Sequence, residues 1–115
     1  MIEISAGTAN DIASIMAVMN SSFDPAFGEA WSASQCISLL VIPGSKLIIA
    51  KDGKNCIGFA MTRWVLDEEE LLMIGVSPAF QRDNVGSRIL EMVIDGAKTG
   101  GRKKLFLEVP YYTFV

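Results

Sequence analysis

The segment from Gln81 to Ser87 carries the clearest chemical signal in this chain of 115 residues. It joins an apolar, strand-like run over 71–76 to a helical run that begins near Val85. The backbone N–H groups of a first helical turn have no partner inside the helix, and the helix dipole adds a partial positive charge beside them. The junction therefore predicts a phosphate-binding loop. Its members are Arg82, Asp83, Asn84, Val85, Gly86 and Ser87.

A family resemblance rests on this loop. The run from Val76 to Leu90 resembles the pyrophosphate-binding signature of the GNAT superfamily of acyl-CoA N-acyltransferases, Gln/Arg-x-x-Gly-x-Gly/Ala. Asn84 stands where the first glycine is usual, and asparagine tolerates left-handed backbone angles better than most residues, so we expect the loop to form. The resemblance implies acetyl-CoA as the co-substrate. It also places acetyl and pantetheine contacts on Ile74, Gly75 and Val76.

Further stretches are similar to a narrower group, the bacterial ribosomal-protein N-terminal alanine acetyltransferases. They are Trp31-Ser32, Leu39-Leu40, Pro43-Gly44, Leu47-Ile48-Ile49-Ala50, Glu70-Leu71-Leu72 and Leu105-Phe106-Leu107-Glu108-Val109. The similarity runs from about residue 1 to residue 109. It implies that the acceptor is the N-terminal amine of a protein.

Acyl transfer by direct attack of an amine on a thioester needs a base, a donor for the developing oxyanion, and a proton or counter-charge for the thiolate. The resemblance assigns the base to Glu108, with Glu70 as the competing carboxylate. From the residues alone, Glu108 also reads as the solvent-facing member of a strand, and Glu70 as part of a solvated acidic turn over 67–70 that attracts a cationic N-terminus. Gly75 would permit a bulge that frees an N–H as the oxyanion donor.

No residue is clearly assigned to supply the proton or counter-charge for the thiolate. Seven residues follow Glu108, and Pro110-Tyr111-Tyr112-Thr113-Phe114-Val115 does not resemble the family. One interpretation makes Tyr111 or Tyr112 the acid, and the other is that these aromatic residues only pack or pair. We therefore expect one GNAT domain over 1–115, shortened at its C-terminus and ending in an atypical tail. The edge strand or the tail is expected to pair with a second copy, giving a homodimer.

Two other functions compete with protein acetylation. One is a catalytically weak or inactive domain that binds CoA. The other is a GNAT enzyme for small amines, in which Trp31, Phe23 and Phe27 line a small-molecule pocket rather than cap the core.

Composition excludes several classes. The chain contains no histidine, which removes Ser-His-Asp and Cys-His catalysis and most zinc sites. Cys36 and Cys56 lack metal-ligand spacing and are expected in the core, so no metal is predicted. The net charge of −3 argues against bulk nucleic-acid binding, with Arg102-Lys103-Lys104 interpreted as a solvated turn. No apolar run reaches membrane-spanning length and no signal peptide begins the chain, which predicts a cytoplasmic protein without a membrane partner.

The elements that must position these residues follow from periodicity and turn signals. We expect strands at 2–5, 46–51, 56–64, 70–76 and 104–109, with a hairpin at 52–55, and a helix over 85–98. Capping boxes at Thr8-x-x-Asp11 and Ser32-x-x-Gln35 open two earlier helices. The order β-α-α-β-β-β-α-β predicts a mixed-sheet α/β fold of the GNAT type, in which the last two strands are parallel neighbours.

Overall fold

The computed structural model describes residues 1–22 and 31–107. Their elements follow the expected order and are β1 (Ile2–Gly7), a 3-10 turn (Ala9–Asp11), α1 (Ile12–Ser22), α2 (Ala33–Leu40), β2 (Ser45–Asp52), β3 (Asn55–Val65), β4 (Glu68–Val76), a second 3-10 turn (Pro78–Phe80), α3 (Val85–Thr99) and β5 (Lys104–Phe106). Glu108, the tail, Phe23 and Phe27 lie outside the described residues.

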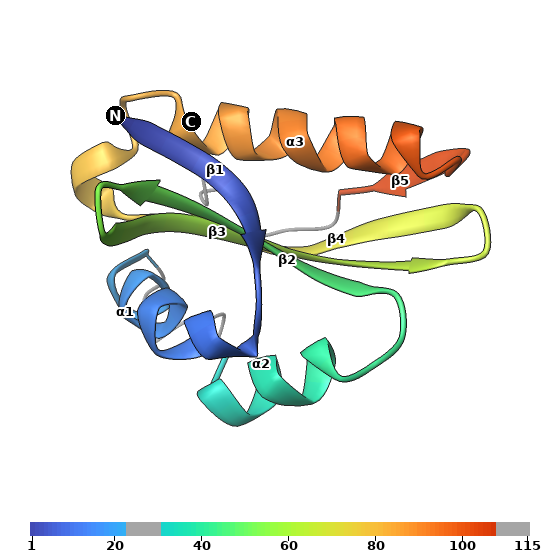
Figure 1. The fold of residues 1–115 in the computed structure, drawn as a ribbon, viewed down its shortest axis with the longest axis horizontal. Helices are drawn as coiled ribbons and strands as arrows, with labels where there is room; N and C mark the ends of the chain where they lie inside the picture. Colours follow the sequence, from blue (N-terminus) through green and yellow to red (C-terminus); the bar gives the residue numbers. More distant parts are fainter. Residues whose placement is uncertain (23–30, 108–115) are drawn as a thin grey trace.

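The five strands form one sheet in the order β1-β2-β3-β4-β5. The first four are antiparallel to their neighbours, whereas β5 pairs in parallel with β4. The parallel pairing confirms the prediction for the last two strands. Helix α3, which connects them, lies on one face of the sheet, and α1 and α2 lie on the other (Figure 1).

Both predicted capping boxes are present. The Thr8 hydroxyl accepts from the Asn10 amide, and the Asp11 carboxylate accepts from the Thr8 amide at 2.9 Å. Ser32 and Gln35 bond reciprocally at 3.1 and 2.7 Å. Because these side chains satisfy amides that the helix leaves unpaired, they fix where the helical segments begin.

The sheet separates two apolar layers. Beneath α1 and α2 lie the buried side chains Ile12, Ile15, Met19, Cys36, Leu47, Ile49, Phe59, Met61 and Met73. Beneath α3 lie Ile48, Ala50, Ile57, Ala60, Leu71, Ile74, Val76, Val85, Ile89 and Val93. Alternation along β2 and β3 sends consecutive residues to opposite layers, as expected for a sheet covered on both faces.

The acidic turn predicted over 67–70 is not a turn. Strand β4 already begins at Glu68, and Val65 pairs with Glu68 so that Leu66 and Asp67 alone form the hairpin tip. Leu66 has a φ of 56°. Glu69 points inward and is buried, because strand alternation places it on the α3 face between Lys46 and Arg102.

The bulge predicted at Gly75 lies elsewhere in β4. Gly75 pairs in register with Phe59, whereas Met61 faces Met73 and Thr62 faces Leu71. Leu72 is thus the extra residue, and a bulged residue is the one that the ladder leaves unpaired.

The solvated turn predicted for Arg102-Lys103-Lys104 is wrong at its first residue. Lys103 and Lys104 are exposed, but the Arg102 side chain is only 12% exposed and contacts Glu69. Helix α3 buries Val85, Ile89 and Val93, whereas Met92 is 37% exposed.

Candidate active site

The predicted phosphate loop precedes α3 directly. Asn84 is the N-cap of the helix and has φ 60° and ψ 22°, which is the left-handed conformation expected for an asparagine in the place of a glycine. Its side chain makes no capping hydrogen bond. The first-turn amides are therefore not capped by the residue that usually caps them.

Hydrogen bonds hold the loop against the end of β4. The Gln81 side chain donates Nε2–H to the Val76 carbonyl at 3.1 Å. The Asp83 amide donates to Phe80 at 3.1 Å, and the Arg88 amide donates to Asn84 at 3.0 Å. Among the described residues, no backbone carbonyl accepts from the amides of 85–87, which leaves them directed at a common point ahead of the helix.

Helix α3 approaches the sheet closely at this end. Gly58 on β3 makes the approach possible, because a Cβ there would lie 2.9 Å from Ile89 Cδ1 and 3.2 Å from the Gly75 carbonyl. Val85 and Gly86 are buried against the sheet. The structure thus brings the loop next to Ile74, Gly75 and Val76, the other predicted cofactor contacts.

Strands β4 and β5 pair over a short distance only. Glu68, Glu69 and Glu70 face Lys104, Leu105 and Phe106, and no described residue of β5 pairs with β4 beyond Glu70. The strands are joined at the start of β4, and the phosphate loop follows its other end (Figure 1). Within the described residues, β4 therefore has no pairing partner in β5 beyond Glu70.

Glu70, one of the two predicted bases, is half-buried beside Arg63 and Phe106, its register partners on β3 and β5. These residues line a hollow of about 220 Å³ together with Val65 and Glu68. The second candidate, Glu108, lies outside the described residues. The structure therefore describes the surroundings of Glu70 alone.

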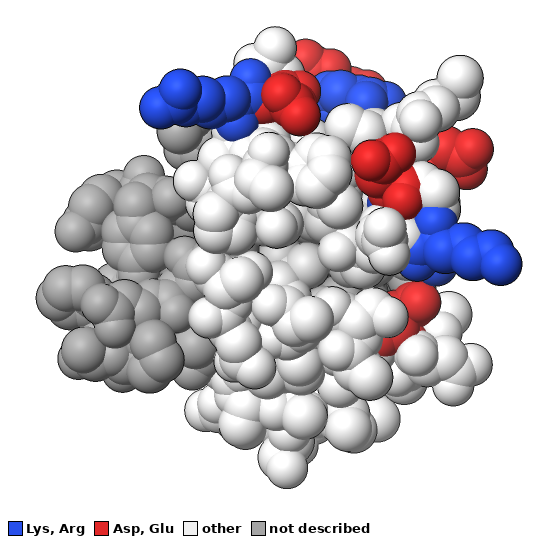
Figure 2. Space-filling model, turned by 90° about the vertical axis from the view of Figure 1, so that its left-hand side faces the viewer, with Lys and Arg blue, Asp and Glu red and all other residues white. Residues whose placement is uncertain are grey.

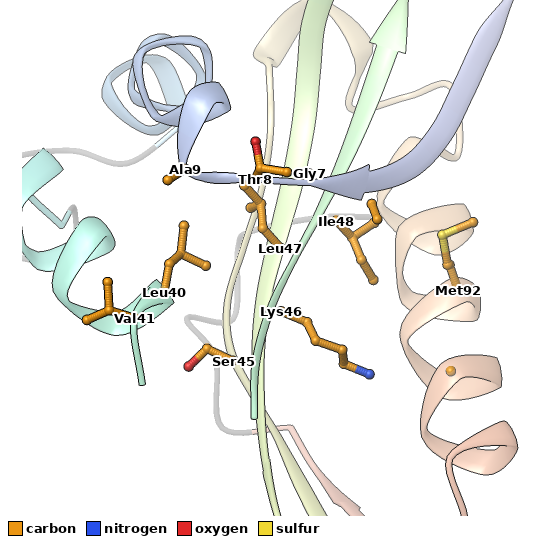
Figure 3. Close-up of a pocket in the computed structure, with 12 residues that line it drawn as sticks. Gly7, Thr8, Ala9, Leu40, Val41, Ser45, Lys46, Leu47, Ile48 and Met92 are labelled. Carbon is orange, nitrogen blue, oxygen red and sulfur yellow. The ribbon is translucent and has the colours of Figure 1, made fainter. Parts of the chain in front are cut away.

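A separate cavity of about 400 Å³ lies along β2. Figure 3 shows its lining, with Leu40 and Val41 on the α2 side of the strand and Met92 on the α3 side. None of the predicted site residues lines this cavity. Lys46 projects from β2 toward α3 in the same view.

Helices α1 and α2 carry no charged side chain. Figure 2, which views the molecule from the left-hand side of Figure 1, shows acidic and basic side chains along the upper rim and one side, and a largely uncharged surface elsewhere. The described residues 12–22 and 31–45 contain no Asp, Glu, Lys or Arg. Electrostatic attraction of a charged partner is thus not a property of these two helices.

The two cysteines are poor nucleophiles. Burial raises the pKa of the Cys36 thiol, and burial also raises the pKa of Cys56 against a smaller opposing effect of its hydrogen bond to the Gly58 carbonyl. A raised pKa lowers the thiolate fraction at neutral pH. Neither thiol is therefore a good candidate for a nucleophile.

The order of the strands and the loop that precedes α3 are those of a known class. The chain belongs to the acetyltransferase (GNAT) family, whose sequence model matches residues 13–112. Among curated proteins, it is 49% identical to the [ribosomal protein bS18]-alanine N-acetyltransferase of Salmonella typhimurium over 51 residues, which cover 44% of this chain and 34% of the relative. The Escherichia coli (strain K12) protein of the same name is 41% identical over 61 residues, or 53% and 40% of the two chains.

Solved structures agree with this assignment. The ribosomal-protein-S18-alanine N-acetyltransferase from Escherichia coli superimposes with a TM-score of 0.84 and 26% identity, over 93% of this chain and 66% of that one. The PaiA N-acetyltransferase from Thermoplasma acidophilum, solved in complex with coenzyme A, shares the fold at a TM-score of 0.82 and 18% identity, over 98% and 82%. The alignments with the curated relatives thus span less than half of those proteins' length.

One finding bears on location. No helix among residues 1–22 and 31–107 is long and apolar enough to cross a membrane.

Proposed function

We propose that this chain transfers the acetyl group of acetyl-CoA to a primary amine, and that the acceptor is the N-terminal alanine of a protein. The observation that carries the proposal is the loop at Asn84, whose left-handed backbone leaves the amides of 85–87 open to a phosphate at the end of β4. The names of the relatives support the acceptor. A ribosomal acceptor would locate the reaction in the cytoplasm.

Acetyl-CoA would supply an acetyl group activated as a thioester. The residues from Arg82 to Ser87 would bind its pyrophosphate, because several converging amides and the α3 dipole favour an anion. The backbone of Ile74, Gly75 and Val76 would contact the part of the molecule that runs along β4. A backbone N–H of the same stretch of β4 would meet the oxygen that gains negative charge.

The acceptor has to reach the carbonyl carbon as a neutral amine. We assign the removal of its proton to Glu108, on the sequence match at Leu107-Glu108-Val109, and Glu70 is the alternative base. The base would pass this first proton, the one that the ammonium loses, to solvent. As the N–C bond forms the C–S bond breaks, and the attacking nitrogen loses a second proton, which goes to the departing thiolate.

A second candidate function is coenzyme binding without efficient turnover. It is favoured by one observation, namely that the matched segments cover 34–40% of the curated relatives' length. The two candidates share the phosphate loop and differ only in the rate of transfer.

Steady-state acetylation of a short peptide that begins with alanine tests the proposed function. The control is the same peptide with a blocked N-terminus, and a polyamine and an aminoglycoside at equal concentration test the small-amine alternative. We expect transfer to the free alanine peptide only. Coenzyme binding with no transfer to any acceptor would favour the second candidate.

A further inference from the structure

A buried cluster of charges joins four elements at the end of the sheet opposite the phosphate loop. Glu69 on β4 is its centre, with a side chain that is 0% exposed. Lys46 Nζ on β2 lies 3.1 Å from Glu69 Oε2, and Arg102 Nε lies 3.5 Å from Oε1. Lys46 also donates a hydrogen bond to Oε1 at 3.4 Å, the oxygen that Arg102 approaches, so the carboxylate is paired with both cations by charge.

Arg102 has two further contacts. Its guanidinium lies 4.0 Å from the centroid of the Trp64 ring on β3, and its Nη1 donates to the Gly100 carbonyl. A Cβ on residue 100 would overlap this guanidinium, so Gly100 makes the room that Arg102 occupies. The side chain is thereby fixed from three directions.

Arg102 lies at the joint between α3 and β5. Its amide donates to the Ala97 carbonyl at 2.9 Å, the next amide, Lys103, donates to the Asp67 carbonyl at 2.6 Å, and β5 begins at Lys104. Strand β5 is only three residues long, and its three partners are Glu68, Glu69 and Glu70. The cluster thus lies where β4 and β5 are joined, immediately before they part.

A buried carboxylate between two cations has a strongly preferred arrangement. Removal of one partner leaves charge uncompensated in the interior, which is costly, and planar guanidinium stacking on an aromatic ring adds a directional contact. Pairing of only three residues with β4 stabilises the position of β5 weakly. The position of β5 therefore depends on the side chain of Arg102, which lies two residues before the strand and contacts Glu69 on β4.

We propose that Arg102 is a positioning residue for the coenzyme groove: through Glu69 and Trp64 it fixes the start of β5, and so sets where β5 leaves β4 and opens the groove. This inference rests on the proposed function for the groove itself. Its structural half, the anchoring of β5, is measurable without coenzyme.

The test combines calorimetric titration of CoA with hydrogen exchange of the amides at 104–106, on the full chain. Arg102→Met should raise the Kd for CoA about fivefold to tenfold and speed exchange at 104–106, with a native circular dichroism spectrum, while Arg102→Lys should recover part of the affinity. Gly100→Ala keeps the charge but displaces the guanidinium, and its backbone (φ −78°, ψ 0°) accepts alanine, so it should behave like Arg102→Met.

Gly96→Ala is the matched control, because its Cβ would meet Lys46 Nζ at an ordinary 3.7 Å, and it should leave both readouts unchanged. If Arg102→Met does not fold, the two readouts on Gly100→Ala test the inference. Unchanged exchange at 104–106 in Gly100→Ala and in any folded Arg102→Met would overturn the inference, as would faster exchange with an unchanged Kd. Absence of CoA binding by the unaltered chain would instead overturn the proposed function.

Discussion

Asn84 starts α3 in a conformation that only glycine adopts without cost, and it is the residue on which the candidate site depends most. Its left-handed backbone turns the chain from the 3-10 turn into the helix and leaves the next three amides without a carbonyl partner in the described chain. Gly86 follows in the first turn and is buried against the sheet. A phosphate at this point would meet the backbone N–H groups of the first turn.

The choice of base is the second question at the residue level. Glu108→Gln keeps the shape of the side chain but cannot accept a proton, so we expect turnover to fall about a hundredfold to ten-thousandfold with little change in CoA affinity. Glu70→Gln is the matched variant on the neighbouring strand and should have the smaller effect. Initial rates of acetyl transfer by the two variants measure the loss of turnover. The reverse ranking would assign the proton to Glu70.

Among the elements, the close approach of α3 to β3 sets the position of the phosphate loop. Gly58→Ala would push against Ile89 and the Gly75 carbonyl, so we expect a loss of about 1–3 kcal/mol in the free energy of unfolding and weaker CoA binding. Chemical denaturation and calorimetry measure the two effects. Gly96→Ala, farther along the same helix, is the control, and an equal response from both would contradict this role for Gly58.

The hairpin between β3 and β4 contains the strained element of the fold. Leu66 combines a φ of 56° with 85% exposure, so its side chain gains little from burial while its backbone carries the cost of the left-handed region. Leu66→Gly should raise the free energy of unfolding by about 1 kcal/mol, because the relief of strain exceeds the added chain entropy. Thermal denaturation would show a higher midpoint. A lower midpoint would mean that the Leu66 side chain makes contacts that outweigh the strain.

Local signals allowed the elements to be predicted, and long-range packing decided what the sequence left open. The capping boxes and the loop at Asn84 are made by residues within a few positions of each other, which is why their spacing was sufficient. Glu69 and Arg102 each lie in a charged run, which is why the sequence predicted them to be solvated. They are buried together because β2, β4 and the segment after α3 pack against one another. The alternation of β4, traced back from Leu71 to Glu69, was the available signal for the burial of Glu69.

The position of the bulge could not be read from the sequence for a related reason. A bulge depends on the register between two strands, and Leu72 differs little in type from its neighbours, whereas Gly75 attracted attention as a glycine. The assignment of Glu108 stays a prediction, since it lies outside the described residues.

At the scale of the whole molecule, the outer strands of the sheet are β1 and the short β5 within residues 1–22 and 31–107. We infer that β5, or the tail beyond it, pairs with a second copy, since an open strand edge presents unpaired N–H and C=O groups. Light scattering on the intact chain should give a dimer or a higher assembly, and a chain ending at Val109 should shift toward monomer. A monodisperse monomer of the intact chain at micromolar concentration would defeat this proposal.

The most direct test of the account is a calorimetric titration of CoA into the unaltered chain and into Gly86→Glu. The new side chain would bring bulk and negative charge to the place where backbone has to approach phosphate, whereas Ser38→Glu adds the same charge on the exposed surface of α2. We predict saturable binding to the unaltered chain and to Ser38→Glu, and none to a folded Gly86→Glu. Equal CoA affinity in all three chains would contradict the assignment of the phosphate site to the loop before α3.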